Sequence, residues 1–402
     1  MACSHLRLST LSSLPYSLCF CAALNFCAAQ NNDVLCHGGD GKFTADFHHA
    51  AQVHVGATKN DGLATRSCEA TLSSEGQQVM VASGALEVDL DVFGADLGMG
   101  MPVAAFQVRK SPTDCCVEYS IYSLQKPPRL LRTLTGGSSF QASDIDLDSR
   151  VEIWTDDAAA VEGFDNLSLF DLNSPPPVVV RFEHNQLLDA GLEFQAYFDQ
   201  RIAKLKEQVD PRDLKEFKSS DGKLAAAPSS YSPETMHRLR KAKIGILEIV
   251  WLYLNSAREQ EAWSTLADMW PAADVERVQT ALVQARGRGI HKQIDGVVAA
   301  GHKRKRATIY DVTMSQGDES QISSPRPILL WRPPPASEQV VTNAEISLDL
   351  IIDSAGKVRS ATGARSIDPD LINAALQWKF IPASNGKRAV ASRTHMAVSL
   401  RR

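Results

Sequence analysis

The spacing of apolar residues changes twice along this chain, and no other feature of the sequence restricts its fold as strongly. Up to about residue 183, short apolar stretches are bounded by glycine, proline and aspartate, which is typical of strands. From about 185 to 286 the apolar residues recur every three or four positions, as in amphipathic helices. Alternation returns from 344 to 353. We therefore expect a multidomain α+β protein.

These patterns divide the chain into segments of different character. Strands are expected at 51–55, 78–81, 103–108, 116–124, 130–134, 151–154 and 178–182. Helices are expected from about 185 to 205, then at 233–256, 259–269 and 273–286, with a looser segment over 210–230. The predicted parts are a signal peptide (1–29), a β-rich N-terminal domain (30–183), a helical middle domain (184–300), a strand with a proline-rich linker (301–339) and a small β-β-α-β C-terminal domain (340–402).

The first thirty residues have the pattern of a secretory signal. A weakly basic start is followed by an uncharged, mostly apolar stretch over 11–29 that ends in Ala28-Ala29-Gln30. We expect cleavage near Ala29 and a periplasmic or secreted protein of a Gram-negative bacterium. Two alternatives stay open, because an uncleaved segment would anchor the chain in the inner membrane and Cys27 could carry a lipid. Membrane contact is expected only if this segment is retained.

Four cysteines follow the signal, namely Cys36, Cys68, Cys115 and Cys116. An even number in an oxidising compartment predicts disulfides, and three pairings can be drawn. We favour a bridge between Cys36 and Cys68, because a bridge between the adjacent Cys115 and Cys116 is the strained and more readily reduced choice.

An acidic loop is the one candidate metal site. Its carboxylates stand at positions 1, 3, 5 and 9 of the loop, as Asp144, Asp146, Asp148 and Glu152. Calcium is bound by such sets of oxygen ligands. The pattern resembles the D-x-D-x-D-G loops of FG-GAP type propeller repeats, with Ser149 in the place of the glycine. The resemblance implies calcium as a cofactor, and the alternative is an acidic turn between two strands.

The last part of the chain has an order of elements and a set of motifs that can be compared with a known family. We expect the order strand, strand, helix, strand after residue 344, with Asp368-Pro369 starting the helix. The motifs are the turn Asp353-Ser354-Ala355-Gly356-Lys357-Val358, the helix end at 371–376, the block Trp378-Lys379-Phe380-Ile381-Pro382-Ala383 and the turn Asn385-Gly386-Lys387.

Together these motifs resemble the C-terminal domain of the TonB energy-transducer family, over about sixty of the 402 residues. The resemblance implies a role in transport or protein binding at the cell envelope, in which the domain adds an extended segment of an outer-membrane receptor to its sheet edge. Two features depart from the family. Trp331-Arg332-Pro333 replaces its Tyr-Pro lead-in, and only a short segment with five prolines, 323–336, stands in place of its long Pro/Lys-rich stretch.

From these observations we expect a non-enzymatic envelope adaptor that binds an envelope protein by strand addition. The edge strand expected to pair with the partner contains Val390, Ser392, Arg393, Thr394, His395 and Met396. One alternative is a membrane-anchored relative of the TonB transducers. Another is an exported hydrolase with its acids in the β-rich domain.

Nucleic acid is not an expected partner, because a net charge of −5 gives no basic field over the whole molecule. The sequence contains none of the G-x-S-x-G, H-E-x-x-H, P-loop or G-x-G-x-x-G motifs, so no catalytic residue is assigned. The ligand of the β-rich domain and the oligomeric state stay open.

Overall fold

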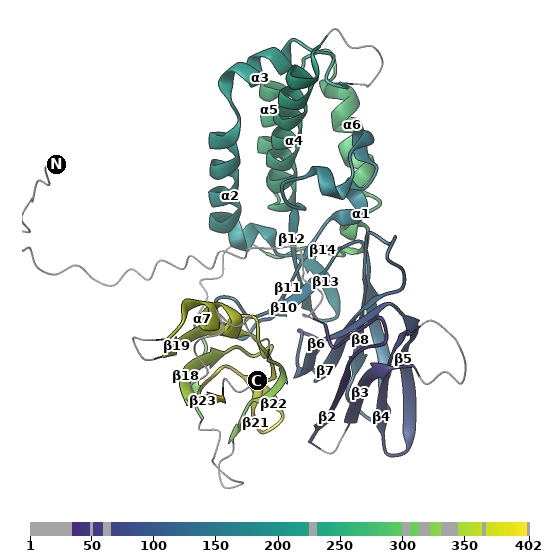
Figure 1. The fold of residues 1–402 in the computed structure, drawn as a ribbon, viewed down its shortest axis with the longest axis vertical. Helices are drawn as coiled ribbons and strands as arrows, with labels where there is room; N and C mark the ends of the chain where they lie inside the picture. The colour runs from purple at the N-terminus through teal and green to yellow at the C-terminus, as the bar shows by residue number, and fades with distance from the viewer. Residues whose placement is uncertain are drawn as a thin grey trace, which may run out of the picture.

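The protein has mixed α+β structure, as the sequence predicted. The structure is a computed structural model that describes residues 34–48, 51–58, 66–224, 231–299, 306–312, 322–330, 345–363 and 367–399. The helices between residues 195 and 286 gather at one end of the molecule, whereas the helix near the C-terminus lies among the sheets at the other (Figure 1). None of the helices in the described ranges is long and apolar enough to cross a membrane. The expected signal at 1–29 lies outside these ranges.

Two antiparallel sheets form the N-terminal part. The first has the order β2 (Lys42–Phe47), β3 (Ala51–Ala57), β4 (Cys68–Ser74) and β5 (Gln77–Ala85). The second has the order β1 (Cys36–His37), β6 (Glu87–Ala95), β7 (Val103–Arg109), β8 (Glu118–Ser123) and β9 (Arg129–Leu134). Apolar side chains of both sheets, such as Val53, Leu72 and Phe106, form one core between them.

Disulfides join all four cysteines of the described chain. The predicted bridge between Cys36 and Cys68 is confirmed, with a Cα–Cα distance of 5.9 Å, and it joins β1 to β4 across the two sheets. Cys115 and Cys116 form a second, vicinal bridge in the loop between β7 and β8. Once the first pair is bridged, the two adjacent cysteines are the remaining thiols of the described residues.

A third sheet lies between the N-terminal sheets and the helices (Figure 1). Its order is β10 (Phe140–Ser143), β11 (Glu152–Asp156), β12 (Pro177–Glu183), β13 (Gln186–Asp189) and β14 (Gly296–Val297). One face packs on β6 to β8 through residues such as Ile153 and Tyr119, and the other packs under the helices through Trp154 and Val179. The sheet containing β6 is therefore covered on both faces.

The helix expected from about 185 begins ten residues later, because its first part is a strand. β12 and β13 form a hairpin whose two turn residues, His184 and Asn185, have φ of 51° and 66°. Two consecutive residues in the left-handed region are the signature of a tight hairpin turn, and asparagine adopts that conformation readily. The leucines at 187 and 188 therefore lie on a strand.

The helical layer packs around one long central helix. The α-helices of the chain are α1 (Ala158–Val161), α2 (Gln195–Gln208), α3 (Pro211–Lys218), α4 (Pro233–Asn255), α5 (Glu259–Met269), α6 (Val275–Arg286) and α7 (Pro369–Ala375), with 3-10 turns η1 (Phe164–Asn166), η2 (Leu169–Asp171), η3 (Gly191–Phe194) and η4 (Ile290–Gln293). Ser232 caps α4 by accepting from the Thr235 amide at 3.2 Å, ahead of Pro233. Asp210 caps α3 in the same way, inside the segment that we expected to be loose.

The C-terminal sheet has the order β15 (Tyr310–Asp311), β23 (Ser392–Ser399), β18 (Glu345–Ile352) and β19 (Val358–Gly363). Together with α7 it follows the expected order strand, strand, helix, strand. Trp378 and Phe380 are buried with Leu348 and Leu371, so the aromatic pair joins the helix to the sheet. Two short ladders complete this part: β16 (Ile322–Ser323) with β21 (Ala383–Asn385) and β22 (Arg388–Val390), and β17 (Arg326–Leu329) with β20 (Lys379–Ile381).

Residues 322–330, which we expected to belong to an extended linker, form β16 and β17 instead. Ile328 is buried in the core of the N-terminal sheets, and Arg326 donates to the backbone carbonyl of Asp46. The apolar side chains outweigh the loss of one backbone donor at Pro327, where the ladder shifts register.

The turn between β18 and β19 attaches the C-terminal sheet to the rest of the protein. Lys357 is only 3% exposed, and its Nζ donates to Asp91 Oδ1 at 2.5 Å and to the Asp91 carbonyl at 2.6 Å. Asp91 Oδ2 accepts from the Tyr119 hydroxyl at 2.7 Å. Lys379 forms a second ion pair with Asp89, also on β6. The C-terminal part is therefore held on β6 by the buried Lys357 and the half-buried Lys379.

Replacing Lys357 with methionine should lower the free energy of unfolding by about 3–5 kcal/mol, because it leaves the buried Asp91 charge without its cation. Lys387→Met is the matched control, since Lys387 is exposed, and it should leave stability unchanged. Urea denaturation measures both. Equal midpoints for the two variants would show that the buried pair does not stabilise the attachment.

Candidate metal centre and partner-binding edge

The acidic loop between β10 and β11 brings three of its four predicted ligands together. One carboxylate oxygen from each of Asp144, Asp146 and Asp148 lies within 4.8 Å of the other two. Asp144 is buried and the other two are half-buried. Mutual repulsion of three carboxylates at this spacing favours a cation or a proton in the loop.

The backbone of the loop has the form that such a site requires. Asp144 caps the loop, because its two carboxylate oxygens accept the amides of Asp148 and Ser149, each at 2.9 Å. Ser149, which stands where the resembling loops have glycine, has φ of 68°. The sharp turn is thus made by a residue with a side chain, at a conformational cost that glycine would avoid.

The fourth predicted ligand, Glu152, is fully buried on the first residue of β11 and lies outside the cluster of three aspartates. Its Oε1 accepts from Arg181 at 3.2 Å, while its Oε2 has no hydrogen-bond partner within the described chain. Burial raises the pKa of Glu152 well above its ordinary value, the Asp146 carboxylate raises it further, and Arg181 opposes both. A buried carboxylate oxygen without a donor costs free energy that a bound cation would offset.

The loop also contacts the turn of the C-terminal sheet. Asp353 Oδ2 accepts from the Ser143 hydroxyl at 2.9 Å and from the Asp144 amide at 3.0 Å. The Ser354 hydroxyl in turn donates to Asp144 Oδ2 at 3.0 Å. Burial, followed by the charge of Asp353, raises the pKa of Asp144 to about 7. The carboxyl that caps the loop therefore titrates near neutrality.

These residues fit a hard divalent cation of the size of calcium. Asp144, Asp146 and Asp148 supply carboxylate oxygens from one short loop, and the structure does not bring Glu152 into the same cluster. A bound cation would add positive charge beside Asp144, which favours the ionised form of that carboxyl.

The predicted partner-binding edge is divided between two strands. Val390 ends β22, and the remaining residues, Ser392 to Met396, belong to β23. β15 runs parallel to the start of β23, pairing Tyr310 with Ser392 and Asp311 with Arg393.

Beyond Arg393, the outer side of β23 pairs with no strand in the described ranges. Thr394 is buried and Met396 half-buried, so these side chains face the core, whereas His395 and Ala397 are exposed. The carbonyls of Ala391 and Arg393 accept from β15, and backbone groups alternate along a strand. The amides of His395 and Ala397 therefore point outward, toward an added strand.

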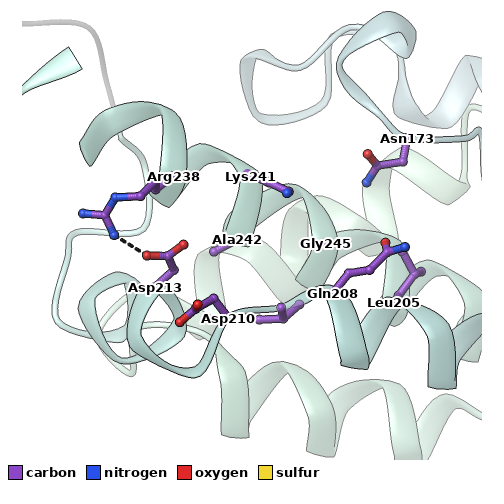
Figure 2. A pocket seen from close by; sticks show the side chains of 10 residues that line it. Asn173, Leu205, Gln208, Asp210, Asp213, Arg238, Lys241, Ala242 and Gly245 are labelled. Carbon is purple, nitrogen blue, oxygen red and sulfur yellow. Dashed lines mark hydrogen bonds and ion pairs between the residues drawn. The ribbon is translucent and has the colours of Figure 1, made fainter. Parts of the chain in front are cut away.

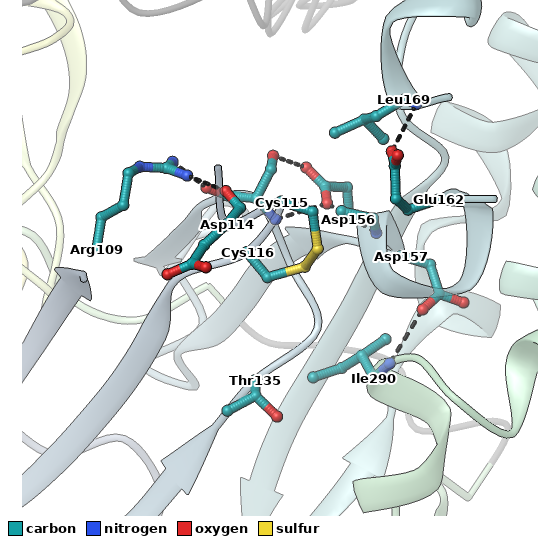
Figure 3. Close-up of a disulfide and its surroundings, with 12 residues drawn as sticks. Arg109, Asp114, Cys115, Cys116, Thr135, Asp156, Asp157, Glu162, Leu169 and Ile290 are labelled. Atoms are coloured by element: carbon teal, nitrogen blue, oxygen red, sulfur yellow. Dashed lines mark hydrogen bonds between the residues drawn. A yellow bond between two sulfur atoms is a disulfide. The ribbon is translucent and has the colours of Figure 1, made fainter. Parts of the chain in front are cut away.

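The vicinal disulfide lies near Asp156 and Asp157, two buried acids of the β-rich domain in which the hydrolase alternative places its site (Figure 3). Asp156 accepts from the Ser138 amide at 2.8 Å, and Asp157 accepts from the Ile290 amide at 3.0 Å. Burial raises the pKa of Asp157 to about 7. Each acid thus holds a loop in place, and the two point to different parts of the structure.

Two hollows of the described surface are lined mainly by the helical layer. Figure 2 shows one of about 290 Å³, lined by α2, α3 and α4, in which Asp213 pairs with Arg238. A second hollow is lined by Tyr253, Gln260 and Glu261. The first hollow includes Asn173, and neither hollow includes the buried acids Asp156 and Asp157.

Sequence reasoning missed the attachment of the C-terminal turn to β6 and to the acidic loop. The one available signal was the pair Asp89 and Asp91, two acids inside the apolar run of a strand that is covered on both faces. Buried acids in such a strand require a partner from elsewhere in the chain. No protein-family model matches this chain, and neither a curated protein nor a solved structure matches it.

Calcium binding to the loop should depend on pH, because Asp144 has to lose a proton of pKa about 7 before it carries its full charge. With one proton released, affinity should rise about tenfold per pH unit up to about pH 7 and level off above it. Isothermal titration calorimetry with calcium chloride measures this.

Asp146→Asn should weaken binding at least about tenfold, whereas Asp114→Asn, which changes an exposed acid outside the loop, should not. A wild-type chain that binds no calcium near neutral pH, or binds it equally at about pH 5.5 and about pH 7.5, would contradict the site.

Proposed function

We propose that this chain is a non-enzymatic adaptor of the bacterial cell envelope, which binds an extended segment of an envelope protein along the edge of β23. In this proposal the N-terminal sheets form a β-rich domain that continues to Asp189, and the helices form a middle domain. Residues 340–402 form a β-β-α-β domain of the TonB C-terminal kind. The proposed location is the periplasm or the cell exterior, after removal of residues 1–29.

One observation carries the proposal: the edge of β23 already holds one added strand. The Tyr310 amide donates to the Ala391 carbonyl at 3.0 Å, and the Val312 amide donates to the Arg393 carbonyl at 2.8 Å. These are the backbone bonds by which a partner segment is bound in strand addition. The same edge continues past Arg393 over several further residues of β23.

The attachment of the C-terminal sheet supports an adaptor over an anchored transducer. A transducer that reaches across the periplasm needs its C-terminal domain on a long flexible tether. Here the turn 353–357 is buried against β6 and β10, so the edge of β23 keeps a fixed orientation relative to the rest of the protein. Neither of the two hollows described above includes Asp156 or Asp157, so neither supports the hydrolase alternative.

Calcium binding is a second candidate function, and the orphaned carboxylate oxygen of Glu152 favours it. In this role the cation would stabilise the loop on which the C-terminal turn rests. The two functions are compatible, because the acidic loop and the outer edge of β23 involve different residues.

The test is to block the outward backbone of β23 without disturbing the inward face. Ala397→Pro removes an outward amide and fits only at a strand edge, and Ala397→Ser is the matched control. The wild-type chain first captures its partner from an envelope extract of a Gram-negative host. The purified partner is then titrated against all three forms.

Ala397→Pro should weaken binding at least about tenfold while Ala397→Ser leaves it unchanged, because only proline removes a backbone donor. Equal affinities for the two variants would contradict strand addition at this edge. Failure of the wild-type chain to retain any envelope protein would count against the adaptor itself.

A further inference from the structure

Residues 310–312 are bound to the C-terminal sheet in the manner of a peptide ligand. Besides the two backbone bonds to β23, Val312 is only 3% exposed. It lies in a small apolar cluster with Ala383 and Val390, beside the half-buried Tyr310. This cluster is separate from the core formed under α7, so the side chain of Val312 fills a site of its own.

The central residue of the segment faces a charge of opposite sign. Asp311 Oδ1 lies 3.7 Å from Nη1 of Arg393, and both side chains are more than half exposed. An exposed ion pair contributes little affinity, but it discourages a basic residue at this position. The outer edge of β23 together with Ala383 and Val390, called the groove below, thus contacts an aromatic residue, an acidic residue and a β-branched residue in turn.

Within the described residues, this internal segment pairs only with the beginning of the edge. β15 is two residues long, whereas β23 is eight. A segment that runs in the same direction and continues past the β-branched residue would also meet the outward amides of His395 and Ala397. It would form more backbone bonds than β15, and these would offset the advantage of an internal segment, whose effective concentration is high.

We propose that residues 310–312 are an internal ligand, and that the groove takes partner segments with the pattern aromatic, acidic, β-branched, followed by about four extended residues that pair with the rest of β23. This proposal rests on the proposed function, since it names the class of partner that the same edge binds. The internal segment occupies the groove until a longer segment of this pattern displaces it.

The experiment uses a fluorescein-labelled peptide, Ala-Thr-Ile-Tyr-Asp-Val-Thr-Val-Thr-Val, whose first six residues are those of 307–312. A second peptide has aspartate in place of the valine that corresponds to Val312. Both are titrated by fluorescence anisotropy against the full chain, in its wild-type form and as three variants. Val312→Asp and Val312→Ala each empty the apolar site, and the second does so without a buried charge. Thr308→Asp is the control, because Thr308 is exposed.

Val312→Asp should bind the first peptide at least about tenfold more tightly than the wild-type chain and Thr308→Asp, with Val312→Ala in between, because an emptied groove no longer has an internal competitor. The second peptide should bind none of them measurably. Thermal unfolding of each variant establishes that it is folded.

Two outcomes would overturn the inference, and they differ in what they say of the proposed function. If both peptides bind Val312→Asp and Val312→Ala equally, the edge adds strands but does not read the β-branched residue. If neither peptide binds a folded Val312→Ala chain, the groove is no peptide site. The proposed function is then judged by the experiment with the captured partner: strand addition at β23 stands if Ala397→Pro weakens binding of that partner, and fails if it does not.

Discussion

The buried contact between the turn 353–357 and the strands β6 and β10 determines how the other parts of this protein are arranged. A charge removed from water is tolerated only when its partners are complete. Asp353 is fully buried and accepts two donors from its own turn, the amides of Ala355 and Lys357, and two from β10 and the residue after it. Lys357 is satisfied by Asp91 in the same way. Separating the C-terminal sheet would leave charges of both signs unpaired, so the sheet is expected to stay in one position.

This contact also places the two candidate sites next to the same segment of chain. Asp144 takes part in the acidic loop and, through its amide, in the contact with Asp353. The carbonyl of Leu147, in the middle of that loop, accepts from the Ala307 amide at 2.6 Å. Ala307 lies three residues before Tyr310, where the internal strand β15 begins. One hydrogen bond therefore joins the acidic loop to Ala307, three residues of chain lead from Ala307 to Tyr310, and further hydrogen bonds join that segment to the edge of β23.

Local sequence patterns were sufficient wherever local chemistry decides the structure. The N-cap of α4 at Ser232 and the period of two in β18 both follow from short-range rules. Local patterns were misleading at 185–189, where a left-handed turn at Asn185 forms a hairpin although the leucines have helical spacing. The described part of the expected linker forms strands for a similar reason, because Ile328 finds a core that a composition rich in proline does not indicate.

The part of the fold that the sequence did not predict depends on contacts between residues far apart in the chain, which no local pattern specifies. Lys357 and Asp91 are 266 positions apart, and Asp353 and Ser143 are 210 apart. The loop ligands could be predicted because their spacing within nine residues is itself the signal. The pairing of Tyr310 and Asp311 with the edge of β23 could not be predicted, because a strand of two residues has no detectable periodicity.

Native-state hydrogen exchange at the Asp144 amide tests the fixed attachment most directly, because this amide donates to Asp353 across the contact. The Phe106 amide, at the centre of β7 between β6 and β8, is the reference for global unfolding. If the C-terminal sheet is fixed, the two amides should exchange with free energies of opening that agree within about 1 kcal/mol. An Asp144 amide that opens several kcal/mol more easily than Phe106, together with the other donors of the contact, would show that the C-terminal sheet detaches on its own.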